Sequence, residues 1–137
     1  MNKHSVFKDY GGAPLVLNIS AAAEKNELFR QALWTGEHLQ LTVMTIPVGE
    51  GIGAEVHEAL DRMLRVESGT ALVRIGDTGE RLRDVRRVST GSALLIPAGT
   101  YHDVLNVGRQ PLRLSSVYAP GAHPKETVHK TKEKAEH

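Results

Sequence analysis

The chain has 137 residues, which is enough for one domain with its own hydrophobic core. Seventeen Lys and Arg residues nearly balance sixteen Asp and Glu residues, and the formal net charge of +1 leaves no basic block that could follow a nucleic-acid backbone. The chain has no cysteine, which excludes disulfides, thiolate catalysis and thiolate metal ligands, so a metal site would need histidines and carboxylates.

No apolar run near the N-terminus has the length of a signal peptide, and no later run approaches the length of a membrane span. From these observations we expect a soluble, cytoplasmic protein that binds neither nucleic acid nor membranes.

The first third of the chain predicts little regular structure. Residues 1–14 are polar and rich in glycine, which predicts an N-terminal arm that is ordered only if other parts of the protein hold it. The short apolar run 15–19 is suited to a strand. Ser20 is a capping residue type, and the helix formers that follow it through residue 27 predict one or two helical turns near the N-terminus. Trp34 is predicted to lie in the core because a tryptophan buries so much apolar surface.

The middle of the chain predicts short strands punctuated by glycine and proline. Leu39, Leu41 and Val43 alternate with polar residues, which is the period of a strand with one buried face. Similar runs give the expected strands 39–46, 62–67, 71–75, 91–96, 101–107 and 112–118. Regularly spaced short strands favour an antiparallel sandwich or barrel, which we expect to span residues 15–120.

Two charged stretches lie outside these strands. Residues 80–88 carry four arginines, Arg81, Arg83, Arg86 and Arg87, which we interpret as a solvated face. Residues 121–137 form a charged C-terminal tail that includes His123 and His129. This tail is interpreted either as solvated or as an arm packed along the barrel or across a dimer mate.

The stretch 91–106 contains the most informative spacing in the chain. Pro97 cannot donate to a sheet ladder and should end the preceding strand at Ile96. Gly99 permits the reversal that follows, so that His102 should begin the next strand at the mouth of whatever the strands enclose. The spacing of Gly91, Pro97, Gly99, His102 and Asn106 resembles the second conserved motif of the cupin superfamily, with every fixed position filled.

This resemblance implies a first cupin motif upstream, with the pattern Gly, His-x-His, Glu and Gly. Gly49 and Gly69 match its two ends, and Glu55-Val56-His57 occupies the His-x-His position. Arg62 stands where the motif has glutamate. The sequence therefore resembles a cupin in which two of these three ligand positions have changed identity.

The residues themselves support one common site. Glu55 and His57 are two residues apart, so on a strand both side chains would point to one face. Arg62 shares its strand face with the apolar Leu64 and Val66 and should therefore point inward. An inward arginine is costly unless a carboxylate or a bound anion satisfies it, and Glu55 is the expected partner.

Two chemical interpretations follow. In the first, Glu55, His57 and His102 hold one divalent transition metal per chain, such as Fe, Mn, Zn or Ni, and the protein is an oxygenase, isomerase or decarboxylase. Arg62 and Tyr118 would then be the catalytic side chains, acting by anion stabilisation or proton transfer. In the second interpretation Arg62 repels a cation, and the protein is a metal-free binding or sensing cupin with Arg62 as an anion clamp. In a third interpretation, which involves no such chemistry, His57 and His102 are merely core histidines.

Further runs, including residues 29–44, 52–57, 96–102 and 127–132, resemble a group of small bacterial cupins without an assigned substrate. Those relatives usually have Asp-Gln where this chain has Asp61-Arg62. The resemblance implies an all-β, antiparallel double-stranded β-helix, or jelly roll, that is often a homodimer. We expect its ligand to be a small polar or anionic molecule. It does not supply a reaction.

Overall fold

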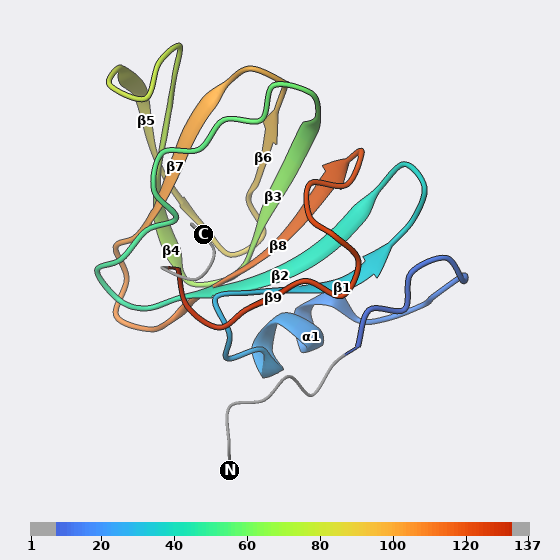
Figure 1. Cartoon of the computed structure of the whole chain (residues 1–137). Helices are drawn as coiled ribbons and strands as arrows, with labels where there is room; N and C mark the ends of the chain where they lie inside the picture. Colours follow the sequence, from blue (N-terminus) through green and yellow to red (C-terminus); the bar gives the residue numbers. More distant parts are fainter. Residues whose placement is uncertain (1–7, 133–137) are drawn as a thin grey trace.

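The computed structural model describes residues 8–132, and in this part of the chain it contains one helix and nine strands (Figure 1). The elements in chain order are α1 (Ile19–Lys25), β1 (Arg30–Thr35), β2 (Gln40–Ile46), β3 (Asp61–Ser68), β4 (Thr70–Gly76), β5 (Leu82–Ser89), β6 (Ala93–Ile96), β7 (Tyr101–Asn106), β8 (Leu112–Ala119) and β9 (Val128–His129). Within residues 8–132, no helix has the length and apolar character needed to cross a membrane.

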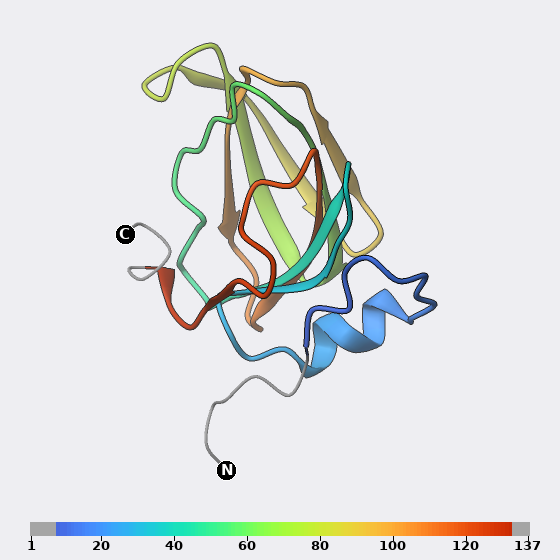
Figure 2. The ribbon, with the colours of Figure 1, turned by 45° about the vertical axis from the view of Figure 1, so that its right-hand side comes forward.

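The strands form two antiparallel sheets that face each other, as expected for a jelly roll (Figure 2). One sheet has the order β6-β3-β8-β2-β1-β9, and the other has the order β5-β4-β7. Residues two apart on facing strands point into the space between the sheets and build the main core together with Phe29 and Ile52, which lie outside the strands. The core consists of Phe29, Met44, Ile46, Ile52, Leu64, Val66, Ala71, Val73, Leu94, Ile96, Val104, Leu112 and Leu114.

The helix α1 covers the outer face of the six-stranded sheet (Figure 1). Ala22 and Ala23 of α1 pack with Leu33, Leu41 and Val43 in a second, smaller apolar cluster. Trp34 is half-buried against this cluster, which agrees with its predicted place in the core.

The predicted strand at residues 15–19 is wrong. Residues 15–18 form no regular element, and Ile19 already belongs to α1. The side chain of Asn18, rather than Ser20, caps the helix by accepting a hydrogen bond from Ala21 N at 2.9 Å. Ser20 instead donates to Glu67 Oε1 at 2.8 Å and so ties the helix to β3. Val16 is fully exposed, so the apolar run buries little surface.

Two segments that lacked a strand prediction are strands. β1 pairs with β2 along one edge of the larger sheet. β5 carries the arginine-rich stretch and pairs with β4 alone, which leaves it an edge strand with mostly exposed side chains. The interpretation of this stretch as a solvated face is therefore confirmed, although its backbone belongs to a sheet.

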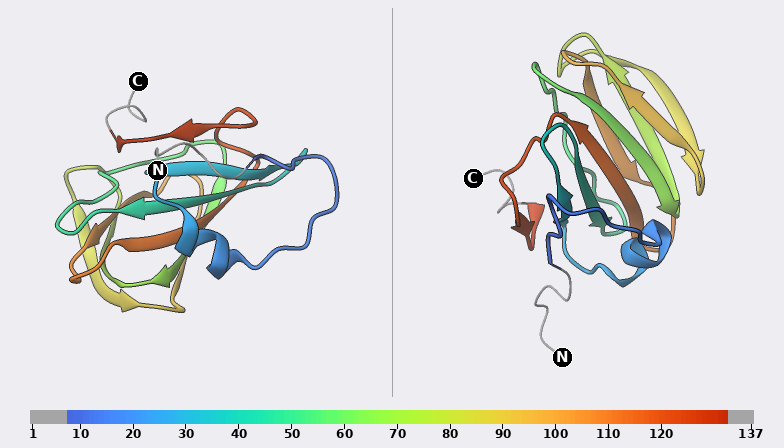
Figure 3. Two further views of the ribbon diagram at one scale, coloured as in Figure 1. Left: turned by 90° about the horizontal axis from the view of Figure 1, so that it is seen from below. Right: turned by 90° about the vertical axis from the view of Figure 1, so that its right-hand side faces the viewer.

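The C-terminal segment, here residues 120–132, lies along the barrel rather than in solvent. Its strand β9 pairs antiparallel with β1, where Arg30 faces His129 and Gln31 faces Val128 (Figure 3). Of the interpretations of the charged tail, the packed arm is correct for these residues. Residues 133–137 of the tail and residues 1–7 of the N-terminal arm lie outside the described part.

Candidate functional site

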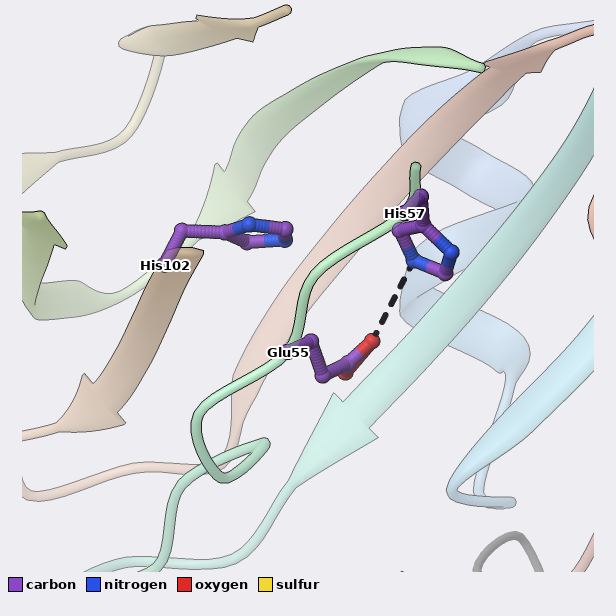
Figure 4. A group of neighbouring side chains, drawn as sticks. All are labelled: Glu55, His57 and His102. Carbon is purple, nitrogen blue, oxygen red and sulfur yellow. Dashed lines mark ion pairs between the residues drawn. The ribbon is translucent and has the colours of Figure 1, made fainter. Parts of the chain in front are cut away.

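Main-chain hydrogen bonds fix Glu55 beside His102, the second residue of β7. Glu55 N donates to His102 O and His102 N donates to Glu55 O, each at 2.9 Å. Glu55 and His57 were predicted to share a regular strand, but they do not. Residues 47–60 connect β2 to β3 irregularly and form only isolated bridges. Their side chains nevertheless meet His102, as Figure 4 shows.

The three predicted ligands form one group. One potential ligand atom from each of Glu55, His57 and His102 lies within 4.8 Å of the other two. His57 Nε2 is 3.6 Å from Glu55 Oε1. Two imidazoles and a carboxylate are donors that suit several divalent transition metals, so by donor type and spacing this group could hold a metal ion.

Arg62 reaches the same group from β3. Its side chain points inward, as predicted, and the residue is only 3% exposed. A guanidinium has five N–H donors. These donors meet five protein groups: Nε donates to Ser116 Oγ at 2.8 Å, Nη1 to Glu55 Oε1 at 3.2 Å and to His102 Nε2 at 3.0 Å, and Nη2 to Tyr118 Oη at 2.9 Å and to Met44 Sδ at 3.6 Å.

The contact with Arg62 fixes the protonation of His102. Arginine can only donate, so His102 Nε2 must be the acceptor and carries no proton. The proton is then on Nδ1, which lies 3.1 Å from Thr100 O and donates to it. Burial, followed by the charge of Arg62, lowers the pKa of His102 below its ordinary value. His102 is therefore a neutral imidazole at neutral pH.

These bonds decide whether a metal fits the present arrangement. A metal ion would need the lone pair of His102 Nε2 and an oxygen of Glu55, and Arg62 Nη1 already contacts both groups. The guanidinium stays protonated and would repel a second cation at this distance. The three residues therefore do not fit a bound metal ion while Arg62 keeps its place.

Glu55 lies between two arginines. Arg62 approaches Oε1, and Arg30 Nη2 lies 3.8 Å from Oε2. Burial alone would raise the pKa of Glu55, but His57, Arg62 and Arg30 together outweigh it and lower the pKa to about 2. Glu55 is thus ionised at neutral pH, and it offsets only part of the surrounding positive charge.

A pocket of about 390 Å³ opens beside Glu55 and is here called the mouth pocket. Its polar lining consists of Arg30, Glu55, His57, His123 and Lys132. Three buried nitrogens of this lining, Arg30 Nε, His57 Nε2 and His123 Nε2, have no hydrogen-bond partner within residues 8–132. Buried polar atoms in native proteins normally have partners, so these three atoms indicate a place for a ligand or for water.

The mouth pocket includes neither of the side chains predicted to be catalytic. Arg62 lies behind Glu55 with its donors paired, and Tyr118 is fully buried with its hydroxyl accepting from Arg62. The ring of Tyr118 makes edge contacts with His57 and with His123, at centroid distances of 5.6 and 5.1 Å. Tyr101 belongs to β7 next to His102 and so points to the opposite face, as predicted.

Three polar residues of the pocket were not among the predicted site residues, namely Arg30, His123 and Lys132. Arg30 did carry a signal, since it is a charged residue inside the apolar run 28–34. No local pattern marks His123 or Lys132, because their place depends on how the C-terminal segment packs against β1.

Comparison with known proteins identifies relatives of the whole chain. The chain is 47% identical over 131 residues to the uncharacterized protein YrkC of Bacillus subtilis, which covers 96% of this chain and 70% of that protein. The crystal structure of BH2720 from Bacillus halodurans has 50% identity and a TM-score of 0.92, and the match covers 94% of this chain and 98% of that one.

A third relative is larger. Glucose-6-phosphate isomerase 1 of Rhodococcus jostii is 33% identical over 119 residues, and this match covers 73% of the chain but only 20% of the isomerase. The family described as Cupin domain matches residues 42–118, which run from within β2 to within β8 and include the Glu55, His57 and His102 group. The chain therefore belongs to the cupin family.

Proposed function

We propose that this cupin binds a small anionic molecule, such as a sugar phosphate, in the mouth pocket without a metal ion. Arg30 and Lys132 supply the positive charge that faces the anion. Arg62 holds Glu55 and His102 from behind, in the role that a metal ion would otherwise have. This differs from the clamp expected from the sequence, because the donors of Arg62 are already used within the protein.

The observation that carries this proposal is the pair of hydrogen bonds from Arg62 Nη1 to Glu55 and His102. They place a permanent cation at two of the three potential metal ligands. Arg30 and Arg62 both pair with the single carboxylate of Glu55, and Lys132 lines the same pocket, so the region around the mouth pocket keeps a positive charge that favours an anion.

The choice of a sugar phosphate as the first ligand to test rests on the Rhodococcus relative, whose name states that it isomerises glucose 6-phosphate. A phosphate group also suits the pocket chemically. Its oxygens accept hydrogen bonds from guanidinium, ammonium and imidazole N–H groups, which are the donors that line this space.

Binding is tested by isothermal titration calorimetry of the full chain with inorganic phosphate and with glucose 6-phosphate. We expect wild type to bind, and we expect Arg30→Ala and Lys132→Ala each to weaken binding about tenfold, through the loss of one charge-assisted contact. Arg83→Ala on β5 is the control, because it removes a positive charge outside the mouth pocket. No binding by wild type, or equal losses in the control, would overturn the proposal.

A metal-dependent enzyme, acting as an oxygenase, isomerase or decarboxylase, is the second candidate. It is favoured by the ligand atoms within 4.8 Å of one another and by His57 Nε2, which has no hydrogen-bond partner among the described residues. When bound, a metal would supply Lewis-acid or redox chemistry at Glu55, His57 and His102.

Elemental analysis of protein purified without chelator separates the two candidates. The metal-free proposal predicts less than about a tenth of an equivalent of any transition metal per chain, because Arg62 competes for the ligand atoms. A stoichiometric metal that disappears in His102→Ala would establish the second candidate instead.

A further inference from the structure

The C-terminal segment forms one wall of the mouth pocket. In addition to the pairing of β9 with β1, two main-chain hydrogen bonds hold this segment. Ala32 N of β1 donates to Thr127 O at 2.8 Å, and Phe29 N, just before β1, donates to Lys130 O at 3.2 Å. Asp9 holds the same segment from another side, since its Oδ2 accepts from Glu126 N at 2.8 Å. The segment is thus fixed at several points around His123 and Lys132.

Gln40 fixes the backbone of His123 itself. Gln40 Nε2 donates to His123 O at 2.8 Å, and His123 N donates to Gln40 Oε1 at 3.0 Å. Gln40 is fully buried at the start of β2. A side-chain amide that pairs with both main-chain groups of one residue leaves that residue little freedom to shift.

The ring of His123 is also fixed. It lies between Tyr118 and His129 in edge contacts, with centroid distances of 5.1 and 5.6 Å. His129 is held in turn by Arg30 Nη1, which donates to its Nδ1 at 3.1 Å. With the backbone and the ring both held, His123 Nε2 is nevertheless buried and has no partner in the described part of the chain.

We propose that His123 is a ligand-binding residue, which donates a hydrogen bond from Nε2–H to an oxygen of the anion in the mouth pocket. This inference rests on the proposed function, and it makes the C-terminal segment part of the binding site. A neutral imidazole carries one N–H, and an anionic oxygen only accepts, so the bound state selects the Nε2–H tautomer.

The fixed geometry favours this role over a purely structural one. If His123 had only a structural role, its buried nitrogen would be expected to have a hydrogen-bond partner within the protein, because an unpaired buried donor costs free energy. Here His123 lines the same pocket as Arg30 and His57, whose Nε and Nε2 atoms also have no hydrogen-bond partner within residues 8–132. An oxygen of a bound ligand would supply the partner that His123 Nε2 lacks in this part of the chain.

The test is calorimetric titration of the full chain with inorganic phosphate and with glucose 6-phosphate. We expect His123→Ala to weaken binding about tenfold, the effect of one lost hydrogen bond to a charged group, and His123→Gln to recover part of the loss because its amide keeps a donor. His38→Ala, which changes an exposed histidine, is the control and should match wild type. Thermal unfolding of each variant checks that it is folded.

Gln40→Ala provides a second measurement, which would give a different result if Gln40 had only a structural role. If Gln40 acts by positioning His123, then Gln40→Ala should weaken binding, and it should have little further effect in a His123→Ala background. Independent effects that add fully would contradict this coupling.

The outcomes separate this inference from the function on which it rests. If wild type binds neither probe, the proposed function fails. A second outcome is that wild type binds, Arg30→Ala weakens binding, and folded His123→Ala keeps an affinity within about twofold of wild type, a change smaller than the loss of one hydrogen bond. In that case the pocket binds anions, but the role of His123 is overturned.

Discussion

At the scale of single residues, Arg62 explains how the barrel tolerates a charge in its interior. A buried arginine is unfavourable unless its charge and all its donors are satisfied. Arg62 meets this condition with a carboxylate, an imidazole, two hydroxyl groups and a thioether. Its guanidinium also lies over the ring of Tyr118, 4.7 Å from the centroid. The orientations of Glu55, His102 and Tyr118 are therefore linked through one side chain.

Replacing Arg62 should change what the site binds. Arg62→Gln removes the cation and frees His102 Nε2 and Glu55 Oε1, and its amide oxygen is itself a potential ligand. We expect bound zinc or manganese, measured by equilibrium dialysis and elemental analysis, to rise from a trace toward one equivalent per chain.

The matched control is Arg74→Gln, because Arg74 pairs with Asp103 at 2.7 Å and is not among the groups that contact Glu55 or His102. The control should bind no more metal than wild type. If Arg62→Gln also stays at the wild-type level while remaining folded, electrostatic exclusion by Arg62 is not what governs metal binding.

At the scale of elements, the sequence predicted strand ends and turns best where they depend on a few neighbouring residues. Pro97 ends β6 at Ile96 as predicted, and Gly99 turns the chain with a φ of 83° so that β7 can begin at Tyr101. Glu55 and Arg62 were also predicted to be partners, because an inward arginine requires a nearby carboxylate. These inferences needed only spacing and side-chain chemistry.

Other elements depend on partners that lie far away in the sequence. Residues 15–19 have the composition of a strand, but residues 15–18 form no regular element, and Asn18 caps a helix that begins at Ile19. β5 is rich in arginine and is still a strand, because it pairs with β4 at an edge where charged side chains reach water. Arg30, His123 and Lys132 line one pocket because the C-terminal segment packs against the sheet, through the β9–β1 pairing and the hydrogen bonds of Gln40 to His123.

The attachment of the C-terminal segment gives a prediction at this scale. Asp9 accepts from Glu126 N, from Gly11 N and from Thr35 Oγ1, so Asp9→Ala removes the partner of three donors. We expect local opening of the segment, and with it trypsin cleavage after Lys125 and Lys130, to become about five- to tenfold faster, as for the loss of a hydrogen bond to a charged group.

Mass spectrometry of the early fragments locates the cuts. Asp84→Ala, which removes an exposed carboxylate of β5, should be cleaved after Lys125 and Lys130 at the wild-type rate. Equal cleavage of Asp9→Ala and wild type would mean that the β9 pairing alone holds the segment.

At the scale of the whole molecule, the barrel combines an apolar core with a polar cluster of neutral histidines. The core consists of aliphatic side chains and Phe29, and it does not titrate. Burial, followed by nearby positive charge, lowers the pKa of His102, His123 and His129, and for His123 the value is about 3. These imidazoles stay neutral to a lower pH in the folded protein than in the unfolded chain, where they gain protons as the pH falls below about 6.5.

The free energy of unfolding should therefore decrease in mild acid. A histidine with a lowered folded-state pKa contributes stability above its unfolded value of about 6.5, and this contribution is lost as the pH falls toward the folded value. For His123 this loss of stability extends from about pH 6.5 to about pH 3. The free energy of unfolding changes by at most about 1.4 kcal/mol per pH unit, and solvent screening of the half-buried ring reduces this slope.

In urea unfolding between pH 7.5 and 4.5, His123→Gln should lose less stability than wild type, whereas His38→Gln, at an exposed site, should follow wild type. Parallel curves for His123→Gln and wild type would show that His123 takes up a proton equally readily in the folded and unfolded states, which the burial of its Nε2 argues against.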